Sequence, residues 1–310
     1  MFNVPVLLVL YNRVENTHNL FETIKKIKPT KLYVAGDGAI HNDRFDYAEC
    51  LKTRSVIMPE WQCEQHHLYK EEHLGKGMMV YQAMNWFFTH ESEGIVLFDD
   101  TLPNHDFFYY CEELLEKYRD NPKIVHISGT NFHKKREKTK NSYYFSAYPG
   151  FWGFATWANR WKGFDLEMTQ FEGENFSKLM VDYFQKGNEK LYWLKRYYIL
   201  KKHKLNIWED QYMFHLWYLG GLCITPNANL ITNVGLKDKK RKIRKLMRNT
   251  QNILPLVHPD SIRQNKEADR YSFKHVYTKA FFKLFTNWFN EYLLGAVMPV
   301  QGKKRSRYPY

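Results

Sequence analysis

Cysteine is scarce in this chain of 310 residues, which has only four cysteines at irregular spacings. No two of them form a Cys-x-x-Cys pair, and this excludes a zinc knuckle or a thioredoxin-like redox site. Isolated thiols of this kind are typical of a reducing compartment, so we expect a cytoplasmic protein with free cysteines. They are Cys50, Cys63, Cys111 and Cys223.

Long apolar runs and phosphate-binding loops are missing too. No stretch of about 18 uncharged apolar residues occurs, so no membrane-spanning helix is expected. The apolar run Val4–Leu10 lacks a basic lead-in and a small-residue cleavage site, so it predicts a buried strand and not a signal peptide. Neither G-x-G-x-x-G nor G-x-x-x-x-G-K-[ST] is present, and a dinucleotide-binding fold or a P-loop ATPase therefore has no support.

Positive charge and aromatic residues are abundant. Lys and Arg number 46 against 33 Asp and Glu, which gives a net charge of +13, and 17% of the residues are aromatic. Aromatic side chains line sugar and base sites, and they also fill bulky cores. The basic residues gather after Gly235 without a recognised nucleic-acid-binding module, so we expect no nucleic-acid partner.

Strand-like and helix-like segments alternate along the chain. This order predicts an α/β fold with a mostly parallel central sheet that is flanked by helices. We expect residues 1–235 to form this domain and residues 236–310 to form a basic, amphipathic, helical extension. The clearest predicted strands are Val4–Leu10, Leu32–Ala35, Ile95–Phe98 and Ile124–Ile127, and the clearest predicted helices are Met78–Phe88 and Asp106–Tyr118.

Polar residues follow three of the predicted strands. They are Asn12-Arg13, Asp37 and Asp99-Asp100, at the strand ends where ligands sit in an open α/β sheet. The adjacent carboxylates Asp99 and Asp100 repel each other, and a Mg²⁺ or Mn²⁺ ion that also binds a diphosphate would relieve this repulsion. A turn or a helix N-cap explains the same two residues equally well, and Asp37 before Gly38 also suits a turn.

Two further features have both a structural and a functional interpretation. Glu209-Asp210 opens a predicted helix, where the pair either complements the helix dipole or supplies a general base. The aromatic segment 143–164 either packs in the core or stacks on sugar rings. His258 stands alone, and a lone histidine is more often structural than a ligand.

Six segments in particular carry a recognisable pattern, in a fixed order along the chain. They are PVLLVLYNR near the N-terminus, AGDG at 35–38, VLFDDTLPNHDFF at 96–108, YPGFWGFATWANRW at 148–161, WEDQYMF at 208–214 and PNANLITNVG at 226–235.

Taken together, these segments resemble GT-A fold glycosyltransferases. The nearest group is the family-2-like sugar transferases that build bacterial surface polysaccharides such as lipopolysaccharide, and the resemblance spans nearly residues 4–270. It implies a metal-dependent, inverting transfer of a hexosyl or N-acetylhexosaminyl group from a UDP-sugar. The acceptor would be a glycan or a lipid-linked saccharide. Residues 1–130 would form the nucleotide-sugar half of the domain and residues 131–235 the acceptor half.

The resemblance also implies roles for individual residues. On the donor side, Tyr11, Asn12 and Arg13 would frame the base and ribose, Asp37 would accept a hydrogen bond from uracil, and Asp99 would bind the ribose or donor sugar. Asp100 would hold the Mn²⁺ or Mg²⁺ ion. The base would be Asp210, although the acid directly after the tryptophan, Glu209, is the one that matches in the nearest relatives. Trp152, Trp157 and Trp208 would contact the acceptor.

The sequence departs from the family pattern at two places. Phe98 stands where relatives carry a Glu, which leaves open a catalytically degenerate homologue that binds glycans or acts as a scaffold. The basic run 237–248 replaces a His-containing segment, and its lysines and arginines could neutralise the leaving diphosphate. A nucleotidyltransferase is a further alternative, but it would need a Gly-rich basic loop after the first strand, and only Arg13 is there.

The C-terminal residues 273–310 combine apolar and basic side chains. On a helix through Val276–Leu294 the apolar residues share much of one face, and basic residues flank it and recur at 303–307. We expect peripheral binding to an anionic membrane surface, the inner face of the cytoplasmic membrane, as the first interpretation. A helix packed on the catalytic domain is the second. Flotation with anionic and neutral liposomes distinguishes the two.

Overall fold

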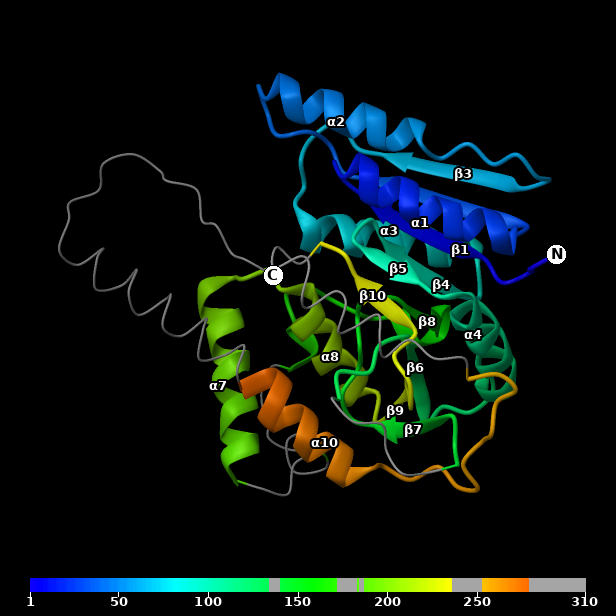
Figure 1. Cartoon of the computed structure of the whole chain (residues 1–310). Helices are drawn as coiled ribbons and strands as arrows, with labels where there is room; N and C mark the ends of the chain where they lie inside the picture. The colour runs from blue at the N-terminus through cyan, green and yellow to red at the C-terminus, as the bar shows by residue number, and fades with distance from the viewer. Residues whose placement is uncertain (134–139, 172–182, 184–186, 236–252, 279–310) are drawn as a thin grey trace, which may run out of the picture.

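A computed structural model of the chain describes residues 1–133, 140–171, 183, 187–235 and 253–278. Its centre is an eight-stranded sheet in the order β3-β2-β1-β4-β8-β6-β9-β7 (Figure 1). The parallel half contains β1 (Val6–Leu10), β2 (Lys31–Gly36), β3 (Glu64–Tyr69) and β4 (Glu93–Phe98). The expected α/β fold with a mostly parallel sheet is confirmed.

The other half of the sheet is mixed. β8 (Phe154–Trp157) runs antiparallel to both β4 and β6 (Ile124–Ser128). β9 (Leu222–Pro226) is parallel to β6, and β7 (Tyr143–Ser146) closes the edge antiparallel to β9. A separate two-stranded ribbon pairs β5 (Thr101–Pro103) with β10 (Ile231–Asn233), directly after the end of β4.

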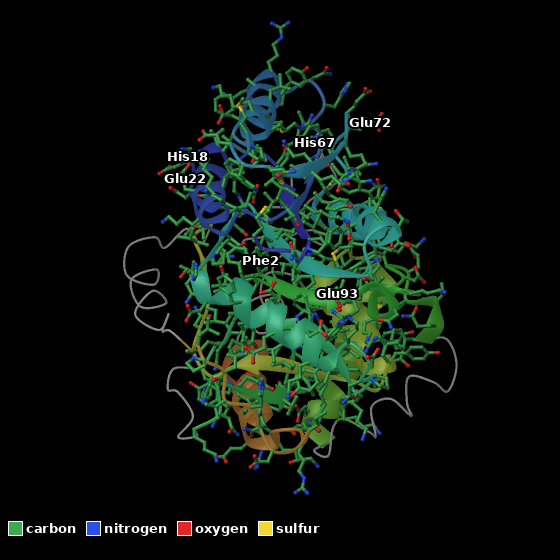
Figure 2. The ribbon with its side chains drawn as sticks, turned by 90° about the vertical axis from the view of Figure 1, so that its right-hand side faces the viewer. Phe2, His18, Glu22, His67, Glu72 and Glu93 are labelled. Atoms are coloured by element: carbon green, nitrogen blue, oxygen red, sulfur yellow. The ribbon has the colours of Figure 1, made fainter. Side chains whose placement is uncertain are left out.

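Helices cover both faces of the sheet because the alternating side chains of its central strands are apolar on each face. Val6, Leu8 and Leu10 of β1 pack in one core with α1 (Val14–Ile27) and α4 (His105–Tyr118). Leu7 and Val9 face the other core, formed with α3 (Lys76–His90) and α8 (Trp208–Tyr218). His18 and Glu22 mark the opposite, polar side of α1 (Figure 2).

The remaining elements lie around this body. α2 (Arg44–Ser55) lies near β3 at one end of the molecule, whereas α7 (Gly187–His203) and α10 (Lys266–Ser272) lie toward the other (Figure 1). The short elements are α5 (Ala158–Trp161), η1 (Thr169–Phe171) and the π-helix η2 (Phe273–Tyr277). A third core holds α7 against α8 through Trp193, Phe214 and Trp217.

The expected C-terminal extension is described only at residues 253–278, and this part is joined to the sheet. The Asn265 N–H donates to the Phe145 carbonyl at 2.7 Å. Asp269 accepts hydrogen bonds from Ser146 Oγ at 2.5 Å and from the Ala147 N–H at 3.0 Å. The basic run 237–248 and most of the predicted helix Val276–Leu294 lie outside the described residues.

Candidate active site

The residues that follow β1 and β4 meet because these two strands are parallel neighbours. Asp99 accepts a hydrogen bond from the Tyr11 N–H at 2.9 Å through Oδ2, and from Arg13 Nη1 at 3.0 Å through Oδ1. The same Arg13 nitrogen lies 2.9 Å from Asp100 Oδ2. One guanidinium group thus pairs with both carboxylates of the predicted acidic motif.

The two carboxylates differ in their surroundings. Asp99 is only 6% exposed, and burial raises its pKa to about 6 although Arg13 opposes the rise. The Asp100 side chain is 21% exposed. Its main chain is held by the segment after β10, where the Val234 N–H donates to the Asp100 carbonyl at 2.8 Å. Of the two carboxylates, Asp100 is therefore the one whose oxygens are more accessible to a metal ion.

Glu209 approaches this acidic pair from the start of α8. Lys76, the first residue of α3, places its Nζ 2.6 Å from Glu209 Oε1. The same Nζ lies 6.0 Å from the centre of the Phe98 ring. Burial acts to lower the pKa of Lys76. The negative charges of Glu209 and Asp100 and the hydrogen bond to Glu209 outweigh this effect, so the pKa of Lys76 is raised. Lys76 therefore links Glu209 to the carboxylates at the end of β4.

Phe98 brings these two parts of the site together. It is the last residue of β4, and its ring lies 5.7 Å from the ring of Trp208, the first residue of α8. This contact fixes the beginning of α8 above the strand end. The ring that replaces the expected acid thus builds the site, instead of leaving a gap in it.

Asp210 has a different partner from Glu209. Its carboxylate is ion-paired with Arg196 of α7, whose side chain is 8% exposed. Burial raises the pKa of Asp210, and Arg196 offsets part of the rise. The Arg196–Asp210 pair joins α7 to α8, while Glu209 is the acid that belongs to the cluster at the strand ends.

Tyr11 and Asn12 are held by an acid, Asp46, that no sequence pattern singled out. The Tyr11 hydroxyl and the Asn12 amide each donate to Asp46 at 2.6 Å, and the Ile40 N–H donates to it at 2.7 Å. Burial would raise the pKa of Asp46, but these hydrogen bonds lower it overall. Asp46 lies in the first turn of α2, and it fixes the loop that the sequence predicted to frame a nucleotide.

Asp37 requires a correction. It is 3% exposed, and its carboxylate accepts hydrogen bonds from the N–H groups of Gly38, Leu74 and Gly75 at 2.9, 2.9 and 3.0 Å. His73 Nδ1 lies 3.0 Å from Oδ2. A carboxylate offers about four acceptor positions, so none is left for a uracil ring. Asp37 instead holds the loop that leads into α3 and Lys76.

Gly38 makes this arrangement of the loop possible. A Cβ atom on Gly38 would lie 2.4 Å from the carbonyl carbon and oxygen of Glu72. The backbone at the end of β2 and the segment after β3 can therefore approach closely only with glycine at this position.

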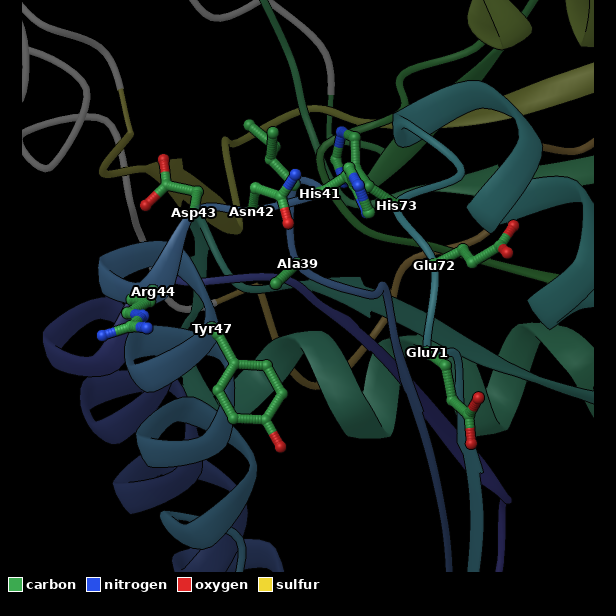
Figure 3. Close-up of a pocket in the computed structure, with 10 residues that line it drawn as sticks. Ala39, His41, Asn42, Asp43, Arg44, Tyr47, Glu71, Glu72 and His73 are labelled. Atoms are coloured by element: carbon green, nitrogen blue, oxygen red, sulfur yellow. The ribbon is translucent and has the colours of Figure 1, made fainter.

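A broad pocket of about 720 Å³ opens between the segment after β2 and the segment after β3 (Figure 3). Arg44 and Tyr47 lie on its α2 side, and Glu71 and Glu72 lie on the other. His73 lines the pocket and also packs against the ring of Tyr11, with ring centres 4.9 Å apart. The pocket thus adjoins the loop after β1.

The tryptophans that were expected to contact an acceptor do not share one place. Trp157 and Trp208 are 2% and 1% exposed and pack in the two cores of the sheet. Protein atoms cover their rings, so their assignment as sugar-stacking platforms is wrong. Trp152 is only partly buried and packs edge-on against Phe132, with ring centres 4.9 Å apart. Its predicted role stays a prediction.

Comparison with known proteins yields distant structural likenesses only. No protein-family model matches the sequence, and no curated protein matches it significantly. A mannosyltransferase from Pyrobaculum calidifontis, solved with GDP-Man and Mn²⁺, is similar over 70% of each chain at 11% identity and a TM-score of 0.38. HddC from Yersinia pseudotuberculosis, solved with GMP-PN, matches 50% of this chain and 77% of its own at 10% identity and a TM-score of 0.31.

A third likeness is to a UDP-glucose pyrophosphorylase solved with UDP-glucose. It covers 46% of this chain and 62% of that one at 10% identity, with a TM-score of 0.25. At such distances none of the three carries a conclusion about the chemistry of this chain.

The acidic pair fits a hard divalent cation on its own chemistry. Asp99 and Asp100 offer carboxylate oxygens at one point, where Arg13 now supplies the positive charge. Within the described ranges, no group of three or more His, Cys, Asp or Glu residues could hold a metal ion. A bound Mg²⁺ or Mn²⁺ would therefore take its remaining ligands from water or phosphate, as Mg²⁺ commonly does.

Two further predictions concern parts of the chain away from the acidic pair: the role of His258 and the presence of membrane-binding segments. His258 lies 2.9 Å from the Tyr143 hydroxyl and 3.0 Å from Glu113, which agrees with its structural interpretation. Among the described residues, no helix is both long enough and apolar enough to cross a membrane. Residues 279–310, which carry most of the predicted membrane-binding sequence, lie outside the described part.

Proposed function

We propose that this chain is a glycosyltransferase that moves a sugar from a nucleotide sugar to the hydroxyl group of an acceptor. The observation that supports this most is the cluster at the carboxyl ends of β1 and β4. There, a carboxylate pair and a guanidinium suit a metal–diphosphate group, and Lys76 nearby contacts Glu209, an acid whose side chain is 25% exposed. Parallel α/β sheets bind ligands at this edge.

The donor diphosphate would be held by positive charge from the chain. Arg13 contacts Asp100, Lys76 feels the charge of Asp100, and both residues lie at helix starts: Arg13 is the N-cap of α1 and Lys76 the first residue of α3. A Mn²⁺ or Mg²⁺ ion held by Asp100 and Asp99 would supply further positive charge beside the departing diphosphate. We propose that the pocket next to Tyr11 and His73 binds the nucleobase of the donor. UDP is the first nucleotide to test.

Glu209 is the general base in this proposal. Its carboxylate takes the proton from the acceptor hydroxyl while that oxygen forms a bond to the anomeric carbon of the donor sugar. The bond from that carbon to the diphosphate oxygen breaks, and its electron pair leaves with the diphosphate. Attack from the side opposite the leaving group inverts the anomeric carbon. Asp210 was the first choice from the sequence, but its pairing with Arg196 favours Glu209.

The acceptor belongs to the same proposal in outline only. A glycan or lipid-linked saccharide would reach Glu209 from the side of α8, within the half of the domain formed by residues 131–235. Transfer to a lipid-linked acceptor would agree with binding of residues 273–310 to an anionic membrane, the interpretation drawn from their sequence.

Donor binding tests this function directly. We expect a UDP-sugar at about a hundred times its dissociation constant to stabilise the chain by about 2.7 kcal/mol in a thermal-shift panel that also contains GDP-sugars. The shift should be larger with MnCl2 than with EDTA, and Asp100→Asn should reduce it. A panel in which no nucleotide sugar stabilises the chain would contradict the proposal. Binding without turnover would identify a degenerate, glycan-binding homologue.

A further inference from the structure

Arg13 lies between Asp99 and Asp100, the two carboxylates that would hold a divalent cation. Its Nη1 atom lies 3.0 Å from Asp99 Oδ1 and 2.9 Å from Asp100 Oδ2. Two carboxylates thus share one positive charge. A cation and this guanidinium cannot share the same two oxygens, so one must leave when the other binds.

In the competition between Arg13 and a cation, the two carboxylates keep their positions. Asp99 is buried, and the Tyr11 N–H holds its second oxygen at 2.9 Å. Asp100 is confined by the segment after β10, because a Cβ atom on Gly235 would lie 2.7 Å from Asp100 Cβ and 2.9 Å from its Oδ2. Asp99 is thus held by burial and by its hydrogen bond to Tyr11, and Asp100 packs closely against Gly235.

Arg13 is the partner that can move. Its side chain is 44% exposed, and within the described part of the chain its ion pairs are with Asp99 and Asp100 alone. It stands at the N-cap position of α1 without a side-chain hydrogen bond to the helix. A change of its side-chain rotamer would free both carboxylates and disturb no helix.

We propose that Arg13 is exchanged from the carboxylate pair to the donor diphosphate when a divalent cation binds, an inference that rests on the function proposed above. A cation alone would have to expel Arg13 into solvent and lose its ion pairs. When a diphosphate binds as well, the guanidinium gains phosphate oxygens, which it binds well in a bidentate manner. The cation and the nucleotide diphosphate therefore bind cooperatively, and Arg13 couples them.

The charges support this exchange. With Arg13 in place, the three groups carry a net charge of about −1, which still attracts a cation but less than two free carboxylates would. Lys76 adds positive charge nearby, but its ammonium is held by Glu209 at 2.6 Å and not by Asp100. Arg13 is thus the group whose removal exposes the carboxylates.

The test measures Mn²⁺ binding by the electron paramagnetic resonance signal of free Mn²⁺, without any turnover. For the full chain, we expect saturating UDP to tighten Mn²⁺ binding by about tenfold or more, within the usual range of coupling between ligands. Arg13→Gln should bind Mn²⁺ alone about tenfold more tightly than the parent, and UDP should then tighten it little. Arg119→Gln is the matched control, because it removes a guanidinium that pairs with Glu93 at the opposite end of β4, and it should leave the coupling between Mn²⁺ and UDP in place.

Two results would overturn the exchange. The first is equal Mn²⁺ affinity in the parent and in Arg13→Gln, both folded by circular dichroism, with UDP-dependent tightening in each. The second is the absence of Mn²⁺ binding in all variants with UDP or GDP, which would also remove metal dependence from the proposed function. Sugar transfer measured in EDTA then distinguishes failure of the Arg13 exchange from failure of the proposed function. Transfer without metal would contradict the exchange and leave the glycosyltransferase assignment standing.

Discussion

Two adjacent acids, Glu209 and Asp210, have separate tasks at the start of α8. Glu209 contacts Lys76 beside the acidic pair, whereas Asp210 forms an ion pair with Arg196 in a buried setting. Adjacent residues of a helix point about 100° apart, so they cannot serve the same site. The choice of base therefore depends on side-chain direction and not on the type of acid.

This separation makes a paired prediction. Glu209→Gln should lower kcat by about two to four orders of magnitude, the usual scale of general-base catalysis, with the melting temperature nearly unchanged. Asp210→Asn should do the reverse, because it breaks the buried ion pair with Arg196, a change that costs up to about 3–5 kcal/mol of stability. Steady-state kinetics and urea unfolding of both variants check this. A large loss of kcat in Asp210→Asn with unchanged stability would reverse the assignment.

At the scale of elements, the loop between β3 and α3 is held by Asp37 and His73. The hydrogen bond and the charge of Asp37 raise the pKa of His73, although burial opposes the rise. A histidine whose folded pKa is raised stabilises the fold fully below its unfolded pKa near 6.5, and this contribution is lost as pH rises through the folded value. The His73–Asp37 pair should therefore stabilise the fold more in mild acid than at alkaline pH.

The corresponding prediction compares stability at two pH values. Between pH 5.5 and 8.5, the parent should lose about 1–2 kcal/mol more unfolding free energy than His73→Gln, which keeps a polar side chain but cannot titrate. Urea unfolding at both pH values gives the difference, and the other histidines cancel in the comparison. If the two proteins lose equal stability, the His73–Asp37 pair does not stabilise the loop through charge.

The elements themselves were largely predictable from the sequence where apolar runs are continuous. β1, β4 and α4 lie within two residues of their predicted bounds, because both faces of β1 and β4 are buried and α4 has a strong apolar stripe. β3 was not predicted, since it is an edge strand with the sequence EQHHLY, whose side chains are mostly polar and partly exposed. β7 and β8 were hidden in the aromatic segment, because all four residues of each strand are buried and no alternation of polar and apolar residues marks them.

The site was predictable only in part, for a similar reason. Arg13, Asp99 and Asp100 could be placed because polar residues at parallel strand ends meet at one edge. Lys76 could not, because its partner Glu209 is 133 residues away in the sequence. Asp46 also meets Tyr11 only through the fold. Aromatic content gave no information on burial, and this is why Trp157 and Trp208 were misassigned.

At the scale of the whole molecule, the described parts of the sequence build one continuous body around the sheet. The parallel half, β3 to β4, presents the loops that surround the pocket and Arg13, and the mixed half supports α8 with Glu209 (Figure 1). Residues 253–278 belong to this body: the Ile253 N–H donates to Asp106 at 2.9 Å, and Asp269 is tied to the end of β7. The expected boundary at residue 235 therefore does not separate these residues from the sheet.

We propose that this chain transfers the sugar of its donor, and not the nucleotide, to the acceptor. Proton and phosphorus NMR of a UDP-sugar incubated with the full chain, MnCl2 and a saccharide acceptor measures this directly. We expect release of UDP and a new glycosidic bond of inverted anomeric configuration, both lost in Glu209→Gln. Release of pyrophosphate, retention of the anomeric configuration, or equal turnover in Glu209→Gln would contradict it.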